Sequence, residues 1–113
     1  MKVVMVEPSK KAYVKDIDSS DETMRKIVGG NLEIMTPFKD MNIELIGNDF
    51  GKLKGLPLNR IIVDSKGNQC DYLCGTYIIC GTSSDGRELV SLTEEQQEFY
   101  KNMFDSVDVC MWQ

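Results

Sequence analysis

The sequence contains no histidine in 113 residues. Histidine is the side chain whose ordinary pKa lies nearest neutrality, and it is the commonest general base and metal ligand in proteins. Its absence excludes Ser-His and Cys-His nucleophiles within one chain. Carboxylate and lysine chemistry stays open, but no pattern assigns a catalytic residue or a cofactor. We therefore expect a binding protein that needs no cofactor, and not an enzyme.

Long apolar runs are also missing. Lys2 is followed by only four apolar residues before Glu7 and Pro8, which is too short for the apolar part of a signal peptide. No run approaches the roughly 18 residues of a membrane-spanning helix. We expect a cytoplasmic protein that makes no contact with membranes.

Positive charge is in short supply. The chain has 13 basic and 18 acidic side chains, which gives a formal net charge of −5. This balance disfavours general affinity for nucleic acid, so direct nucleic-acid binding is not expected. The acids are spread along the chain, so composition alone does not define a nucleic-acid mimic.

The composition is otherwise that of an ordinary globular protein. Hydrophobic residues make up 42% and charged residues 27% of the chain. No internal repeat or low-complexity linker divides it. We therefore expect residues 1–113 to form a single domain.

Two helices are marked by capping boxes, Ser19 with Glu22 and Thr93 with Gln96, and glycines at 29–30 end the first.

Short strands are expected at 3–6, 13–17, 32–35, 43–46, 61–63, 77–80 and 88–91, with 77–80 central in a sheet. Helices separated by several strands predict a small α+β fold with a largely antiparallel sheet and two short helices.

Aromatic residues gather near the C-terminus. Phe99, Tyr100 and Phe104 are expected to pack in the core. The weakly alternating tail, residues 107–112, is either a further strand or a contact with a second subunit. Because its apolar residues include Trp112, we expect a homo-oligomer.

The four cysteines raise the question of a metal site. Cys70 and Cys74 are spaced like one zinc knuckle, but Cys80 lies in an apolar strand and Cys110 is distant. Structural zinc sites usually contain two such pairs. We therefore expect no metal and interpret the cysteines as buried free thiols.

Residues 51–60 form the most unusual stretch, and we expect an ordered loop there. Lys52, Lys54 and Arg60 are three cations with no acid between them. Gly55 permits close backbone approach to a ligand, and Pro57 stiffens the loop. Arg60 can form a two-pronged contact with phosphate or carboxylate.

A structural interpretation of the same segment stays open. Asn59 can read a base edge, or it can hold its own loop backbone, and Arg60 can pair with an acid such as Asp64. Gly75 and Thr76 form a second candidate, whose amide and hydroxyl can reach a ligand held by the loop. Alternatively, these two residues form a bulge or tight bend.

Several segments resemble a family of small domains of unknown function carried by phages, plasmids and conjugative elements of Gram-positive bacteria. The resemblance spans nearly the whole chain, and the tail beyond Met103 departs from it. The segments are MKVVMVEP at 1–8, VGG at 28–30, KGLPLNR at 54–60, CGTYIICG at 74–81 and LTEEQ at 92–96. This resemblance implies a role in conflict between mobile elements and their hosts, in the host cytoplasm.

Two functions follow as hypotheses. In the first, the protein counters host defence by sequestering a small anionic ligand such as a nucleotide immune signal. The expected ligand-binding residues are Lys52, Lys54, Gly55, Asn59, Arg60, Gly75 and Thr76. In the second, an acidic surface binds and inhibits a host defence protein, and mimicry of nucleic acid is one form of this hypothesis. A hydrolase using carboxylates and a metal ion is a weaker third.

Overall fold

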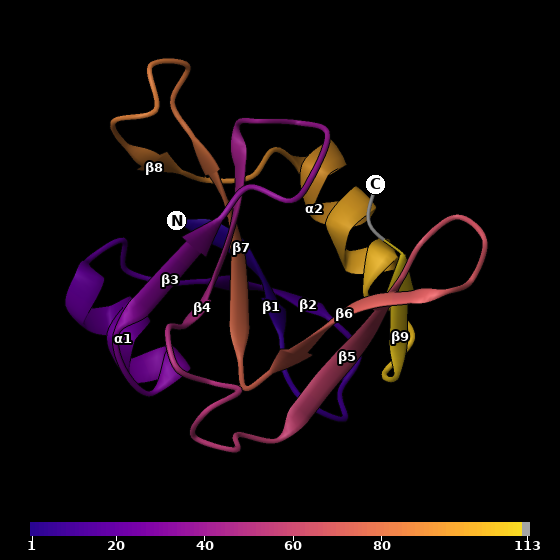
Figure 1. The fold of residues 1–113 in the computed structure, drawn as a ribbon. Helices are drawn as coiled ribbons and strands as arrows, with labels where there is room; N and C mark the ends of the chain where they lie inside the picture. The colour runs from indigo at the N-terminus through magenta and orange to yellow at the C-terminus, as the bar shows by residue number, and fades with distance from the viewer. Residues whose placement is uncertain (112–113) are drawn as a thin grey trace.

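A computed structural model describes residues 1–111 (Figure 1). Its elements, in chain order, are β1 (Lys2–Val6), β2 (Tyr13–Asp16), α1 (Asp21–Val28), β3 (Leu32–Met35), β4 (Ile43–Asn48), β5 (Leu58–Val63), β6 (Gln69–Cys74), β7 (Tyr77–Thr82), β8 (Leu89–Val90), α2 (Glu94–Met103) and β9 (Val109–Met111). No helix in this part of the chain is long and apolar enough to cross a membrane.

The strands form two sheets. The larger has the order β2-β1-β7-β4-β3, with β8 paired to β7, and the smaller has the order β6-β5-β9. Neighbouring strands are antiparallel except β5 and β9, which run parallel. The α+β class, the largely antiparallel pairing and the central position of β7 are confirmed. β6 was not among the expected strands, because Gln69 and Asp71 interrupt the apolar pattern of this segment.

Both helices begin at side-chain caps. At α2 the capping box is confirmed: Gln96 N donates to Thr93 Oγ1 at 3.1 Å, and Thr93 N donates to Gln96 Oε1 at 2.8 Å. At α1 the predicted cap is wrong by one residue, since Thr23 N donates to the hydroxyl of Ser20 and not of Ser19. Asp18 orients that cap by accepting from Ser20 N.

The larger sheet is covered on both faces. On one face, α1 contacts β3, β4 and β7, and its Met24 and Val28 belong to one apolar cluster with residues of β1, β4 and β7. On the other face, a single cluster includes Tyr100 and Phe104 of the α2 region together with Ile62 of the smaller sheet. Phe99 is the exception to the predicted core, because its side chain is 48% exposed.

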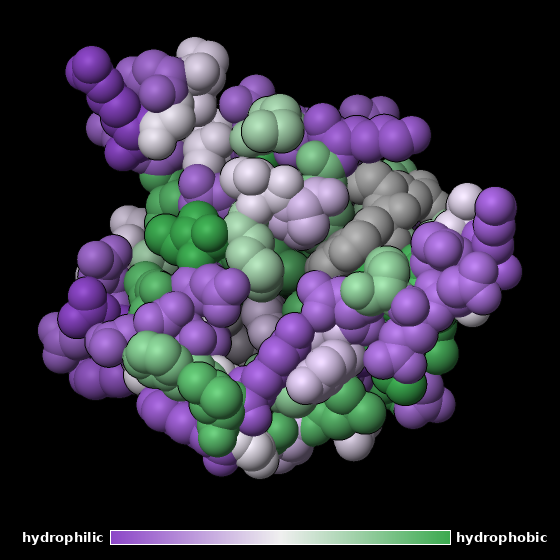
Figure 2. Space-filling model, viewed as in Figure 1, coloured by the Kyte–Doolittle hydropathy of each residue, from purple (hydrophilic) through white to green (hydrophobic). Residues whose placement is uncertain are grey.

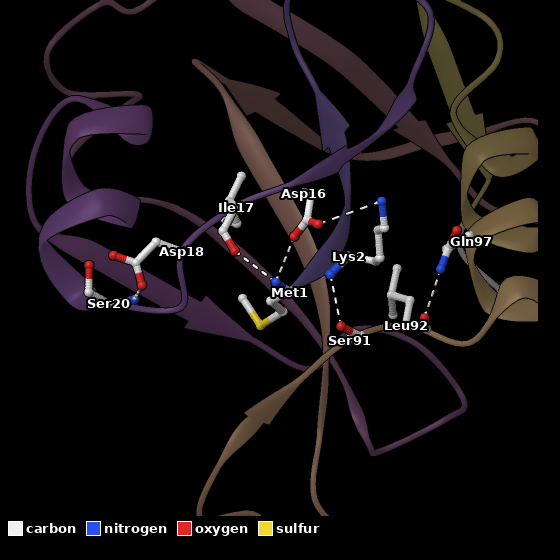
Figure 3. A network of polar contacts seen from close by, with 9 residues as sticks. All are labelled: Met1, Lys2, Asp16, Ile17, Asp18, Ser20, Ser91, Leu92 and Gln97. Atoms are coloured by element: carbon white, nitrogen blue, oxygen red, sulfur yellow. Dashed lines mark hydrogen bonds and ion pairs between the residues drawn. The ribbon is translucent and has the colours of Figure 1, made fainter.

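The N-terminal segment is held by polar contacts to two distant segments (Figure 3). The Met1 ammonium donates to Asp16 Oδ1 and to Ile17 O, both at 2.8 Å. Lys2 N donates to Ser91 Oγ at 2.8 Å, which ties β1 to the segment before α2. These contacts fix the position of β1, the strand that ends beside Arg60.

Candidate functional site

Arg60 lies on β5 and is fully buried. The predicted loop is therefore shorter than 51–60, since β5 already begins at Leu58. The Arg60 guanidinium donates from Nη1 to Glu7 O at 3.2 Å, and from Nη2 to Lys10 O at 2.6 Å and Phe104 O at 2.9 Å. It thus joins β5 to the turn after β1 and to the end of α2.

The proposed pairing of Arg60 with Asp64 is wrong. Asp64 Oδ1 accepts from the backbone amides of Lys66 and Asn68 in the turn after β5. Within residues 1–111 no carboxylate forms an ion pair with Arg60. Burial lowers the pKa of Arg60, and uncharged carbonyl groups satisfy most of its donors.

Asn59 is buried beside Arg60 and holds the junction between the sheets. Its Nδ2 donates to Val6 O at 2.9 Å and to Gly75 O at 2.6 Å, while its Oδ1 accepts from Arg60 Nη1 at 2.7 Å. The amide side chain therefore has partners on both ends, and its contacts extend beyond its own loop.

Gly75 and Thr76 form the bend between β6 and β7. Gly75 has a φ of 85°, and its N donates to Pro57 O at 2.8 Å. A Cβ at this position would lie 2.9 Å from Leu56 Cδ1. The predicted loop at 51–60 and the Gly75-Thr76 segment therefore do lie together. They pack directly on each other at this bend, and no ligand is needed to bridge them.

The two loop lysines have different surroundings. Lys52 Nζ lies 2.8 Å from Asp71 Oδ1 and 4.4 Å from the centre of the Tyr72 ring. The hydrogen bond to Asp71 raises the pKa of Lys52. Lys54 is exposed, next to Gly55 at a φ of 65°. Of the seven predicted ligand-binding residues, Lys52 and Lys54 are therefore the side chains that offer an exposed positive charge.

A cleft of about 470 Å³, here named the acidic cleft, lies between β3, the loop after β4, and β6. It is lined by Glu33, Met35, Asn48, Asp49, Phe50, Gly51, Lys52, Leu53, Asp71, Tyr72, Leu73 and Tyr77. The face shown in Figure 2 exposes hydrophobic residues among hydrophilic ones over β3 and this loop.

Buried residues build the floor of the acidic cleft. Gly47 of β4 has no side chain, and a Cβ there would collide with the Tyr77 ring, so the glycine lets the ring lie against the strand. Burial raises the pKa of Tyr77 to about 12, which keeps its hydroxyl neutral. Asn48 accepts from Phe50 N at 2.9 Å and donates to Val28 O, which fixes the loop against the end of α1.

Acids and exposed apolar side chains form the rim of the acidic cleft. Glu33, Asp49 and Asp71 contribute three carboxylates against the one ammonium group of Lys52, and this ammonium already bonds Asp71. Glu33 and Asp49 form no ion pair with any residue in the described range. The cleft therefore has an excess of negative charge.

The acidic cleft was not predicted from the sequence, although a signal for it is present. Two acid–aromatic pairs, Asp49-Phe50 and Asp71-Tyr72, occur on either side of the predicted loop. The exposed fractions of the aromatic side chains are 46% for Phe50 and 39% for Tyr72. Exposed apolar side chains rimmed by polar residues are typical of interaction surfaces.

Within residues 1–111, no three or more histidine, cysteine, aspartate or glutamate side chains lie together in an arrangement that could hold a metal ion. Cys74, Cys80 and Cys110 are buried as predicted, whereas Cys70 is exposed, contrary to the prediction. Burial raises the pKa of Cys80 and of Cys110 to about 12. Trp112, on which the oligomer hypothesis partly depends, lies outside the described residues.

The fold and the site define a small α+β domain with an acidic cleft where its two sheets meet. The chain belongs to the family described as a domain of unknown function (DUF3846), whose model matches residues 1–105. The search of curated proteins and the search of solved structures gave no significant match.

Proposed function

We propose that this protein is a protein-binding inhibitor whose acidic cleft captures a basic segment of a partner protein. The observation that carries the proposal is the composition of the cleft: an aromatic floor and rim with three carboxylates and one already paired cation. A lysine or arginine side chain combines an apolar stem with a charged end, so it complements such a surface.

The charge of the whole surface supports the same choice. Because Arg60 is buried, 12 of the 13 basic side chains remain to balance 18 acidic ones at the surface. Sequestration of a small anion, the first hypothesis from the sequence, loses two of its seven residues, since the side chains of Asn59 and Arg60 bond to the protein itself. Lys54 and Lys52 support that hypothesis less strongly.

The biological setting comes from the resemblance to proteins of phages, plasmids and conjugative elements. Proteins of such elements gain from blocking host defence, so we propose that the partner is a host defence protein in the cytoplasm. Many such proteins act on nucleic acid through basic surfaces. The acidic cleft would bind such a basic surface and block its access to nucleic acid, so the protein would inhibit by binding and not by catalysis.

A capture experiment tests the proposal. The immobilised protein is incubated with a lysate of a Gram-positive host, and the captured proteins are compared with those held by two double variants. We expect Glu33→Lys with Asp49→Lys to lose the partner, because reversed charges repel a basic segment. Glu88→Lys with Glu98→Lys changes exposed acids outside the cleft by the same charge and is the matched control.

The same protein is titrated with a panel of anionic nucleotides. Retention of one partner by wild type and control, but not by the cleft variant, supports the proposal. Equal capture by both variants, or nucleotide binding that is lost in Lys54→Glu and not in the cleft variant, would contradict it.

A further inference from the structure

β3 is one of the two terminal strands of the larger sheet, and its one strand partner in the described chain is β4. A terminal strand presents one row of backbone groups to solvent unless a bulge, a charge or another segment covers it. β3 borders the acidic cleft directly, since Glu33 and Met35 line it.

The register shows which groups of β3 face outward. Asp49 N donates to Asn31 O at 2.9 Å, just before the ladder begins. In an antiparallel ladder, hydrogen-bonded pairs recur every second residue, so Glu33 and Met35 bond to β4. The amide and carbonyl groups of Leu32 and Ile34 then point away from β4. Within residues 1–111 no hydrogen bond outside the β3–β4 ladder involves the backbone groups of Leu32 or Ile34.

β6, the other terminal strand at the acidic cleft, has an outer edge that is partly occupied. β6 is also terminal in its sheet, but the Asp71 carboxylate accepts from Tyr72 N at 2.7 Å. A side chain thus occupies a backbone donor in the middle of that strand. Of the two edges that border the cleft, β3 is the one whose outward groups are free.

The side chains of β3 match an incoming strand on both faces. Ile34 is 54% exposed on the face that also carries α1, whereas Glu33 and Met35 lie on the cleft face. A strand added beside β3 would place alternate side chains on these two faces. Basic residues would then lie near Glu33, and apolar residues near Ile34.

We propose that the partner segment binds in extended form as an additional strand on the free edge of β3, with alternate basic and apolar residues. This inference rests on the proposed function and names the partner's chemistry and binding mode. A second copy of the chain is a poorer occupant, because antiparallel pairing of β3 with itself brings the Glu33 carboxylates of two copies together.

A labelled seven-residue peptide, Thr-Arg-Val-Arg-Val-Arg-Thr, tests the mode by fluorescence anisotropy. Two derivatives are N-methylated on the backbone, one at both valines and one at the first and third arginines. In an added strand, one of these two sets of amides faces β3 and the other faces solvent. We expect methylation of one set to weaken binding at least about tenfold and of the other less than about threefold.

The outcomes separate the two proposals. Binding that needs Glu33 and Asp49 but is changed equally by both derivatives would overturn the strand mode and leave the proposed function standing. Failure of the parent peptide to bind, while the capture experiment still retains a partner that needs Glu33 and Asp49, would overturn the strand mode alone, and failure of both experiments would overturn both proposals. The protein alone could also form a dimer that Glu33→Gln strengthens and that the peptide does not dissociate. That result would overturn the strand mode in favour of a second copy of the chain.

Discussion

The Arg60 guanidinium donates from Nη1 to Asn59 Oδ1 at 2.7 Å, and both side chains are buried where the two sheets meet. Asn59 in turn donates to Val6 O and Gly75 O. Asn59 therefore connects β5 to the end of β1 and to the β6–β7 bend. Arg60 connects β5 to the turn after β1 and to the end of α2. These contacts place the β6 side of the acidic cleft relative to the β3 side.

Arg60→Met is expected to lower the free energy of unfolding by about 3–5 kcal/mol. The substitution removes a buried guanidinium and leaves several buried carbonyl groups without a donor. Urea unfolding followed by circular dichroism measures the change. Lys54→Met is the matched control, expected within about 0.5 kcal/mol of wild type because Lys54 is exposed. If Arg60→Met is as stable as wild type, the structural role of Arg60 is wrong.

Gly75→Ala is expected to destabilise the protein more than Gly55→Ala. Both glycines have positive φ, of 85° and 65°, so alanine is strained at either position by about 1–2 kcal/mol. A Cβ at Gly75 also lies 2.9 Å from Leu56 Cδ1, while none of the structure lies within 4 Å of one at Gly55. Thermal unfolding of both variants measures the difference. Equal losses would argue against tight packing at the bend.

The Asp71 carboxyl is expected to make the free energy of unfolding depend on pH in the acidic range. Burial alone would raise the pKa of this carboxyl, but hydrogen bonds from Lys52 and Tyr72 N, with the Lys52 charge, lower it below 3.8. A lowered native pKa contributes stability that is present above the unfolded-state pKa and is lost as the pH falls through the native pKa.

The difference in unfolding free energy between wild type and Asp71→Asn should therefore shrink as the pH falls from about 6 to about 3. Asp71 is 43% exposed, so we expect a small effect. Chemical denaturation at several pH values measures it, with Asp49→Asn as the control, since Asp49 forms no ion pair in the described chain. A difference that stays constant with pH would contradict the role given to the Lys52–Asp71 pair.

Local patterns predicted much of the fold and little of the site. The α2 capping box, the end of α1 and the apolar β7 depend on residues close in sequence, and each was predicted. The role of Arg60 depends on acceptors 44, 50 and 53 residues away, which no local pattern reveals. The acidic cleft likewise combines Glu33, Asp49 and Asp71 from three segments, so its charge appears only after folding.

We propose that the acidic cleft is the binding site, and not the exposed end of the predicted loop at Lys54 and Gly55. Nuclear magnetic resonance titration of isotope-labelled protein with the Thr-Arg-Val-Arg-Val-Arg-Thr peptide tests it most directly. We expect the largest amide shifts in β3, residues 49–53 and β6, and we expect them to vanish in the Glu33→Lys, Asp49→Lys variant. Shifts confined to Lys54 and Gly55, or shifts produced by anionic nucleotides and not by the peptide, would contradict it.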